Sequence, residues 1–257
     1  MDRQPLPFPQ VRLLAFLLLG ARLAAAEDVD ALLRRAEALD ERNDNREALP
    51  LYLEAGRLRP GDPEILRLTA KQYSQLMEET ASVAEKKALG QKALAAAEEA
   101  VRAGPNHAKA RLALAIISGK TAFLESPRRQ VEMSRLIKEE AEAAARLDPG
   151  DDYAWHVLGR WNYELANFNP VLKALAQTIY GKFPDASNEK AAEHLRKAVA
   201  INPHRVIHRI ELGRTYLALG EREKARTELE KGLSLPSRAK DDEETKKRGR
   251  LALERLK

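Results

Sequence analysis

Small apolar residues recur along this chain at helical spacing, and each such stretch runs into a proline. These prolines end the runs RLRP, RAGP, RLDP, AINP and LSLP, and they are Pro60, Pro105, Pro149, Pro203 and Pro236. Their spacings are 45, 44, 54 and 33 residues. Proline is tolerated just beyond a helix end or in the first turn of a helix. Each proline therefore predicts the end of one helix pair and the beginning of the next.

The residues before these prolines predict how the helices pack. Counting back 12, 8 and 5 positions from the first four prolines reaches mostly alanine, with a larger apolar residue in some sets. Small residues at this spacing lie on one helix face and allow two antiparallel helices to approach closely. The residues are Ala48, Tyr52 and Ala55; Ala93, Ala97 and Ala100; Ile137, Ala141 and Ala144; and Ala191, Leu195 and Ala198.

The last unit matches the 34-residue tetratricopeptide pattern of alternating large and small apolar residues that ends in proline. Its residues are Leu212, Gly213, Tyr216, Ala225, Leu229, Gly232 and Pro236, with the proline one position early. The first unit, which ends at Pro60, fits the pattern more loosely. The chain is therefore expected to be all-α, a tetratricopeptide-repeat-like α-solenoid of antiparallel helix pairs in about five units.

The middle units are longer than 34 residues, and their extra residues predict additional helix. Ser82–Leu94 and Pro127–Lys138 are helix-prone and predict lengthened helices in the second and third units. In the fourth unit, Val171–Tyr180 predicts an inserted short helix. After Pro236, Asp241–Leu256 mixes charges with leucines, as expected of the polar-backed helix that caps a solenoid.

Composition narrows the chemistry that the chain can perform. The sequence is 44% hydrophobic, 5% aromatic and 32% charged, and it contains no cysteine. The absence of cysteine excludes disulfides, thiolate metal sites, iron–sulfur clusters and a cysteine nucleophile. The net charge is +5, with both signs interspersed rather than clustered beside aromatic residues. We therefore expect no nucleic-acid partner.

The first 26 residues predict an export signal that is not part of the fold. Nine uncharged, mostly apolar residues, 13–21, lie between Arg12 and Arg22, and three alanines end at Ala26. A membrane span needs about 20 apolar residues, whereas a signal peptide needs fewer, followed by small residues. We predict cleavage between Ala26 and Glu27, one repeat domain over residues 27–257, and a periplasmic or secreted protein. A mitochondrial presequence and an uncleaved N-terminal membrane anchor are the alternatives.

Several stretches of the chain resemble the regulator of microtubule dynamics family. The resemblance covers about residues 30–255, and its stretches are 115–117, 130–149, 159–166, 171–184, 190–203 and 235–236. It implies a tetratricopeptide-like adaptor. Animal members are associated with microtubules, the spindle and mitochondrial outer-membrane contacts, which gives a cytoplasmic, cytoskeletal or mitochondrial localisation as the alternative. Microtubules are expected as a partner only if the N-terminus is not an export signal, because an exported protein would not meet tubulin.

Two motifs resemble catalytic or metal-binding chemistry, and neither is complete. Gly119-Lys120-Thr121 is similar to the end of a phosphate-binding loop, but that loop needs a glycine where Leu114 stands. His204 and His208 are four residues apart, yet no HExxH motif or third ligand accompanies them. We therefore expect no enzyme activity, no cofactor and no metal.

The concave face of the predicted solenoid is the candidate binding surface. In tetratricopeptide proteins the first helix of each pair lines this face. With the small residue at repeat position 8 as register, positions 2, 5 and 9 point into the groove. The candidate groove residues are Arg67, Lys71, Lys109, Tyr153, His156, Arg160 and Arg214. The alternative is that the cations bond neighbouring glutamates or helix carbonyls.

These patterns predict a non-enzymatic scaffold or adaptor that binds another protein or peptide in a partly basic groove. An acidic peptide would suit this groove through charge-assisted hydrogen bonds. An N-terminally anchored membrane tether or a microtubule-associated protein is the alternative function. Reversing the charge of Arg160 and Arg214 is expected to abolish partner binding without changing stability.

Overall fold

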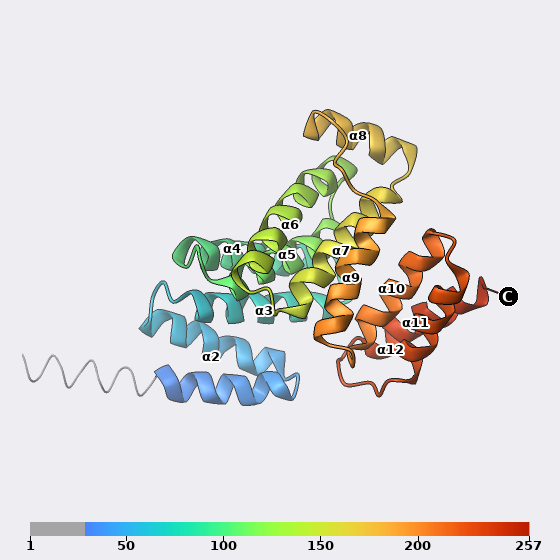
Figure 1. Cartoon of the computed structure of the whole chain (residues 1–257). Helices are drawn as coiled ribbons and strands as arrows, with labels where there is room; N and C mark the ends of the chain where they lie inside the picture. Colours follow the sequence, from blue (N-terminus) through green and yellow to red (C-terminus); the bar gives the residue numbers. More distant parts are fainter. Residues whose placement is uncertain (1–28, 257) are drawn as a thin grey trace, which may run out of the picture. The chain divides into compact units, whose positions relative to one another are not determined.

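The computed structural model of the chain describes residues 29–256 (Figure 1). Residues 1–26, for which the sequence predicts a signal peptide or an anchor, lie outside the described residues. The predicted cleavage and the export that it implies therefore stay predictions. Among the residues that are described, no helix is long and apolar enough to cross a membrane.

Contacts between helices divide the chain into two compact units, which meet in the sequence between Ala103 and Gly104. The first unit contains helical residues 29–41, followed by α2 (Asn45–Leu58), α3 (Pro63–Glu79) and α4 (Val83–Ala103). The second contains α5 (Ala108–Ala122), α6 (Pro127–Leu147), α7 (Asp152–Ala166), α8 (Pro170–Tyr180), α9 (Asn188–Ile201), α10 (Val206–Ala218), α11 (Arg222–Ser234) and α12 (Asp242–Glu254). The stretch 29–256 contains helices and no strand, which confirms the all-α class. A single domain from residue 27 onward stays a prediction.

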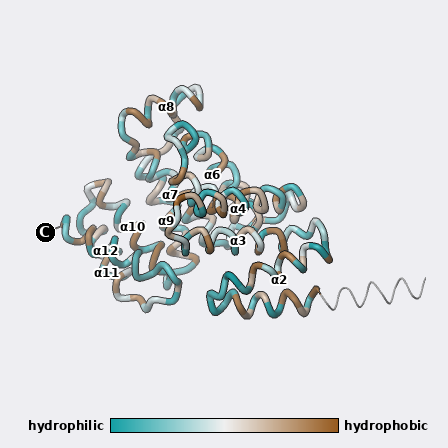
Figure 2. The backbone as a smooth tube through the Cα atoms, turned by 180° about the vertical axis from the view of Figure 1, so that it is seen from behind, coloured by the Kyte–Doolittle hydropathy of each residue, from teal (hydrophilic) through white to brown (hydrophobic). Residues whose placement is uncertain are grey.

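Helices that follow one another in the chain stack side by side within each unit. In the first unit α3 packs against α2 and α4. In the second, α5 pairs with α6, α7 with α9, and α10 with α11, while α6 contacts α7 and α9 contacts α10. Figure 2 shows polar and apolar residues alternating along these helices, as expected where one side of a helix is buried. This is the predicted tetratricopeptide-like arrangement.

The proline and alanine pattern correctly locates the helix ends and the packed faces. Each of the five prolines lies two residues beyond the end of a helix, namely α2, α4, α6, α9 and α11. The residues 12, 8 and 5 positions before the first four prolines are all buried except Ile137, which is partly buried. Their small side chains therefore make the contact between paired helices.

The extra residues of the middle units form helix, as predicted. α4 and α6 are 21 residues long, α8 covers the predicted insertion, and α12 covers the predicted cap and packs on α10 and α11. α8 lies against α6 (Figure 1). The Tyr180 hydroxyl lies 2.7 Å from the hydroxyl of Ser134, and the Arg135 guanidinium lies 4.8 Å from the centre of the Tyr180 ring.

Local sequence fixes where several of these helices begin. The side chains of Asp62, Ser126 and Asn169 each accept a hydrogen bond from a backbone N–H of the first turn. Each is followed by a proline, whose fixed φ suits the first helical position and whose missing N–H is not needed there. These caps fix the first residues of α3, α6 and α8 through contacts between residues that are neighbours in the sequence.

Two glycines allow the first helix of a pair to approach its partner closely. A Cβ atom at Gly159 would lie 2.6 Å from Cγ of Leu195, and one at Gly213 would lie 2.6 Å from Cγ of Leu229. The backbone nitrogen of Leu229 would lie only 3.1 Å from the added atom at Gly213. Neither leucine can move away easily, because both are fully buried.

We therefore expect Gly213→Ala to lower the free energy of unfolding by about 1–3 kcal/mol, the usual cost of overpacking. Gly119→Ala is the matched control, because Gly119 is also helical and its added Cβ would meet nothing closer than Ile137 at 3.9 Å. This control should raise stability by about 0.5–1 kcal/mol, the helical advantage of alanine over glycine. Urea unfolding of the three proteins checks both values. Equal stability of Gly213→Ala and wild type would contradict the described approach of α10 and α11.

Candidate functional site

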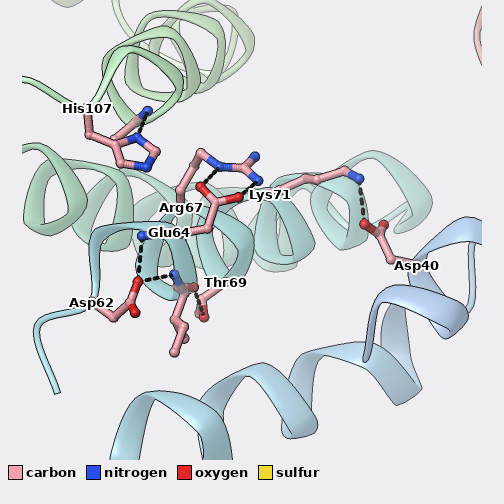
Figure 3. Close-up of polar contacts among 9 residues, drawn as sticks. Asp40, Asp62, Glu64, Arg67, Thr69, Lys71 and His107 are labelled. Carbon is pink, nitrogen blue, oxygen red and sulfur yellow. Dashed lines mark hydrogen bonds and ion pairs between the residues drawn. The ribbon is translucent and has the colours of Figure 1, made fainter. Parts of the chain in front are cut away.

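The two candidate cations of the first unit both pair with carboxylates. Nε and Nη2 of Arg67 donate to the Glu64 carboxylate at 2.7 and 2.6 Å, and Nζ of Lys71 lies 2.6 Å from Oδ2 of Asp40 (Figure 3). Glu64 is one helical turn before Arg67 on α3, so this pair is local. Arg67 and Lys71 therefore follow the alternative interpretation, in which the candidate cations pair with carboxylates of the protein itself.

The remaining candidates belong to the second unit, and four of the five gather on α7 and α10. Tyr153, His156 and Arg160 lie along α7, while Arg214 lies on α10, which contacts α7. Lys109 stands apart as an exposed residue in the first turn of α5, and it forms no ion pair with any residue from 29 to 256. The structure therefore brings together the candidates of the last two repeats.

A buried carboxylate organises the guanidinium groups on this side of the second unit. Glu211 of α10 is 1% exposed, and its carboxylate lies 2.6 Å from Arg214, 3.3 Å from Arg160 and 3.7 Å from Arg248. Arg160 also pairs with Glu164 at 2.8 Å. Burial alone would lower the pKa of Arg160, but the negative charges of Glu211 and Glu164 outweigh burial and raise it.

This arrangement changes what the charge reversal of Arg160 and Arg214 would do. Either glutamate substitution would place a second negative charge against the buried Glu211 carboxylate. Leaving a buried carboxylate without its partners is strongly destabilising. The expectation that stability stays unchanged is therefore corrected, and the two arginines have a structural role beside any role in binding.

A pair of buried histidines lies next to this cluster. Nδ1 of His156 lies 3.0 Å from Nδ1 of His208, and Nε2 of His208 lies 2.8 Å from Oδ2 of Asp152. An ionised carboxylate only accepts, so Nε2 of His208 donates to Asp152. A neutral His208 then accepts at Nδ1, and His156 donates to it from its own Nδ1. A proton on both facing nitrogens would break this contact.

The surroundings of the pair keep both rings neutral. Burial, followed by the repulsion that a protonated His208 and the Arg160 guanidinium would exert on a second positive charge, holds the pKa of His156 well below its usual value. Burial also lowers the pKa of His208, although the hydrogen bond to Asp152 opposes this shift. Asp152 in turn pairs with Nε of Arg205 at 2.7 Å. The Tyr153 ring makes T-shaped contacts with both histidine rings, each with ring centres 5.6 Å apart, and Arg205 lies 4.5 Å from the centre of the Tyr153 ring.

A cavity of about 530 Å³ opens between α10 and α12. Its lining contains four arginines and no carboxylate; the lining residues are Tyr163, Arg214, Leu217, Ala218, Arg222, Arg248, Leu251, Ala252 and Arg255. Arg214 also lies 5.4 Å from the centre of the Tyr163 ring. Sequence reasoning identified Arg214 and missed the other three arginines. The helical spacing of Arg248, Leu251 and Arg255 in the predicted cap was the signal that could have found two of them.

The two incomplete motifs lie where they form no site. Gly119, Lys120 and Thr121 are inside α5, not in a loop after a strand. His204 precedes the first residue of α10 and so does not share a helix face with His208. No group of three or more His, Asp or Glu that could hold a metal occurs within residues 29–256.

The neutral histidine pair predicts a pH dependence of stability. Unfolded histidines bind protons below a pKa of about 6.5, whereas the folded pair, with its lowered pKa, does not until the pH is lower. Stability is therefore fully present above pH 6.5 and is lost as the pH falls towards the folded pKa values. From pH 7.5 to 5.5 we expect a loss of about 1 kcal/mol for each of the two histidines.

Urea unfolding at several pH values measures this loss. The variant His156→Gln/His208→Gln should reduce the dependence between pH 7.5 and 5.5 and leave the contribution of His194, whose pKa burial also lowers. His204→Gln, at an exposed position, should keep the wild-type slope. A wild-type slope in the double variant would contradict the neutral, buried pair.

Solved structures of known proteins share this architecture. The chain is similar to a thermophilic TPR protein of Thermus thermophilus, with a TM-score of 0.61, 20% identity, and coverage of 88% of this chain and 98% of that one. It is also similar to the pilF protein of Pseudomonas aeruginosa, with a TM-score of 0.54, 14% identity, and coverage of 91% and 93%. At these identities the likeness shows the tetratricopeptide-like fold.

Curated relatives extend the comparison to sequence. Regulator of microtubule dynamics protein 3 of Xenopus laevis is 27% identical over 222 residues, which are 85% of this chain and 48% of the relative. Protein 2 of Homo sapiens is 25% identical over 69% of this chain and 44% of the relative, and protein 1 of Mus musculus is 25% identical over 88% and 74%. The chain thus spans about half the length of the first two relatives.

A family model confirms the resemblance that the sequence suggested. The model described as Regulator of microtubule dynamics protein 1-3 matches residues 32–257. Because this match covers most of the chain, the protein belongs to the regulator of microtubule dynamics family.

Proposed function

We propose that this protein is a non-enzymatic interaction scaffold that binds an acidic region of a partner protein through its arginine face. The arginine face consists of Arg160, Arg214, Arg222, Arg248 and Arg255. The observation that carries the proposal is the excess of positive charge there. Three of the five guanidiniums, those of Arg160, Arg214 and Arg248, share two carboxylates, Glu164 and Glu211. Arg222 and Arg255 form no ion pair among residues 29–256.

The fold supports a protein partner. Helical solenoids act through extended surfaces that bind other chains, and the arginine face lies on α7 and α10, the first helices of their pairs, and on the neighbouring α11 and α12. Guanidinium groups bind carboxylates through paired, charge-assisted hydrogen bonds. The cavity lining contains one aromatic side chain, Tyr163, against which Arg214 already packs, whereas single-stranded nucleic acid needs successive stacking surfaces. We therefore assign the face to protein and not to nucleic acid.

Microtubules are the first partner to test, because the curated relatives are named regulators of microtubule dynamics. This choice requires that the chain is not exported. If residues 1–26 are removed during export, the acidic partner is an exported protein instead. If they are retained as an anchor, the same face would tether a membrane to its partner.

Cosedimentation of the full chain with polymerised tubulin tests the proposal. We expect saturable binding that weakens as salt is added, because salt screens exposed charges. The variant Arg222→Glu/Arg255→Glu should bind at least about tenfold more weakly, since two exposed cations become repulsive. The variant Lys224→Glu/Lys231→Glu reverses the same charge on α11 outside the cavity lining and is the matched control.

One result would contradict the arginine face as the binding surface, and another would contradict the choice of microtubules as the partner. Equal weakening by both double variants would mean that net charge, and not the arginine face, controls binding. No saturable binding by the wild-type chain would remove microtubules as the partner. Thermal unfolding of each variant establishes that lost binding is not lost folding.

A further inference from the structure

We infer that the cavity between α10 and α12 is a binding site for a short acidic segment, in which two carboxylates flank an apolar side chain. This inference rests on the proposed function, since it gives the acidic partner a defined site and a defined chemistry. Three properties of the cavity support it: its available hydrogen-bond donors, its uncompensated charge and its apolar wall.

Of the four arginines that line the cavity, two already bond to other groups of the protein and two have guanidinium nitrogens available for a ligand. Arg214 pairs with Glu211 at 2.6 Å, and Arg248 lies 3.7 Å from Glu211 and donates to the Thr245 hydroxyl at 3.0 Å. The Arg255 side chain is exposed and forms no hydrogen bond or ion pair within residues 29–256, while its backbone N–H donates to the carbonyl of Leu253. Arg222 is also exposed and uses one nitrogen, Nη2, to donate to the carbonyl of Leu256 at 2.9 Å. We therefore assign the ligand contacts to Arg222 and Arg255.

The charge of the cavity is not compensated by its own lining. Four guanidiniums line it, and the Glu211 carboxylate that faces two of them is shared with Arg160. Like charges held close together repel. A carboxylate that enters the cavity relieves this repulsion and gains charge-assisted hydrogen bonds, so binding of an anion is favoured on both counts.

The apolar wall distinguishes an acidic peptide from a simple anion. Leu217, Ala218, Leu251 and Ala252 lie between the arginines, and Leu251 is 53% exposed. The apolar residues and the two available arginines, Arg222 and Arg255, thus line the same cavity. A peptide that combines acidic and apolar side chains suits this lining, whereas a lone phosphate would leave the apolar wall in water. A volume of about 530 Å³ suits a segment of a few residues rather than a folded surface.

Isothermal titration calorimetry of the full chain with the peptide acetyl-EELEE-amide tests the site. We expect one peptide to bind per chain, and the acetyl-QQLQQ-amide peptide to bind at least about tenfold more weakly, because its neutral amides lose the charge-assisted bonds. Acetyl-EESEE-amide, which lacks the apolar side chain, should also bind more weakly.

Protein variants locate the binding. Arg222→Gln/Arg255→Gln should weaken binding of acetyl-EELEE-amide at least about tenfold. Arg255→Gln alone, at an exposed position whose side chain has no partner among the described residues, should weaken it without a change in the unfolding midpoint. Lys246→Gln/Arg250→Gln removes the same charge from α12 outside the cavity lining and should leave binding unchanged.

Several outcomes would overturn the inference. Equal affinity for the acidic and the amide peptides would exclude carboxylate recognition, and equal weakening by the control variant would place the binding elsewhere. Displacement of the peptide by millimolar inorganic phosphate would indicate a phosphate-bearing ligand instead. If the wild-type chain binds microtubules but not the peptide, this inference fails while the proposed function stands. If it binds the peptide but not microtubules, the choice of partner fails while the site stands.

Discussion

Close approach of paired helices is the constraint on which the rest of the structure depends. Most of the contact positions hold alanine or glycine, and at Gly213 and Gly159 even one added carbon would overlap a buried leucine. Because those small residues must face the partner helix, the directions in which the other sides of α7 and α10 point are also determined. The residue after each of these glycines is an arginine, Arg160 or Arg214, and the packing turns both towards the buried Glu211 carboxylate. The fold thus determines where the cations gather.

The Glu211 carboxylate links the fold to the arginine face. A buried carboxylate is costly unless cations and donors surround it, and here guanidiniums from α7, α10 and α12 do so. The cap helix α12 is therefore held to the last repeat by charge as well as by apolar packing of Ala252 and Leu256. The same arrangement supplies two of the arginines that line the cavity. The contacts that hold the cap helix α12 to the last repeat therefore also position arginines of the candidate site.

Local periodicity made most of the fold predictable. Helix ends followed from prolines, packed faces from alanines, and the insertion and the cap from helix-prone residues outside the repeat, because each of these signals lies within a few residues of the element that it determines. The repeat register likewise places Tyr153, His156 and Arg160 on one side of α7, although His156 is buried there against His208 and does not face an open groove.

Contacts between distant residues were not predictable from such signals. The spacing of His204 and His208 drew attention in the sequence without indicating a site, whereas in the structure the partner of His208 is His156, 52 residues away in the chain. The cavity could not be predicted because α12 lies outside the repeat pattern. No repeat register therefore indicates which side of α12 faces α10. Arg160 and Arg214 were identified as groove cations, but their shared carboxylate was not, because nothing in the spacing marks Glu211 as buried.

Competition between the two ligands tests the central claim most directly, namely that one cationic site on α10 and α12 binds the acidic partner. The full chain is bound to polymerised tubulin, and acetyl-EELEE-amide or acetyl-QQLQQ-amide is then added up to saturation of the site. We expect the acidic peptide to release the chain from the microtubules and the amide peptide to leave it bound. A bound fraction that stays unchanged at saturating acidic peptide would contradict the claim.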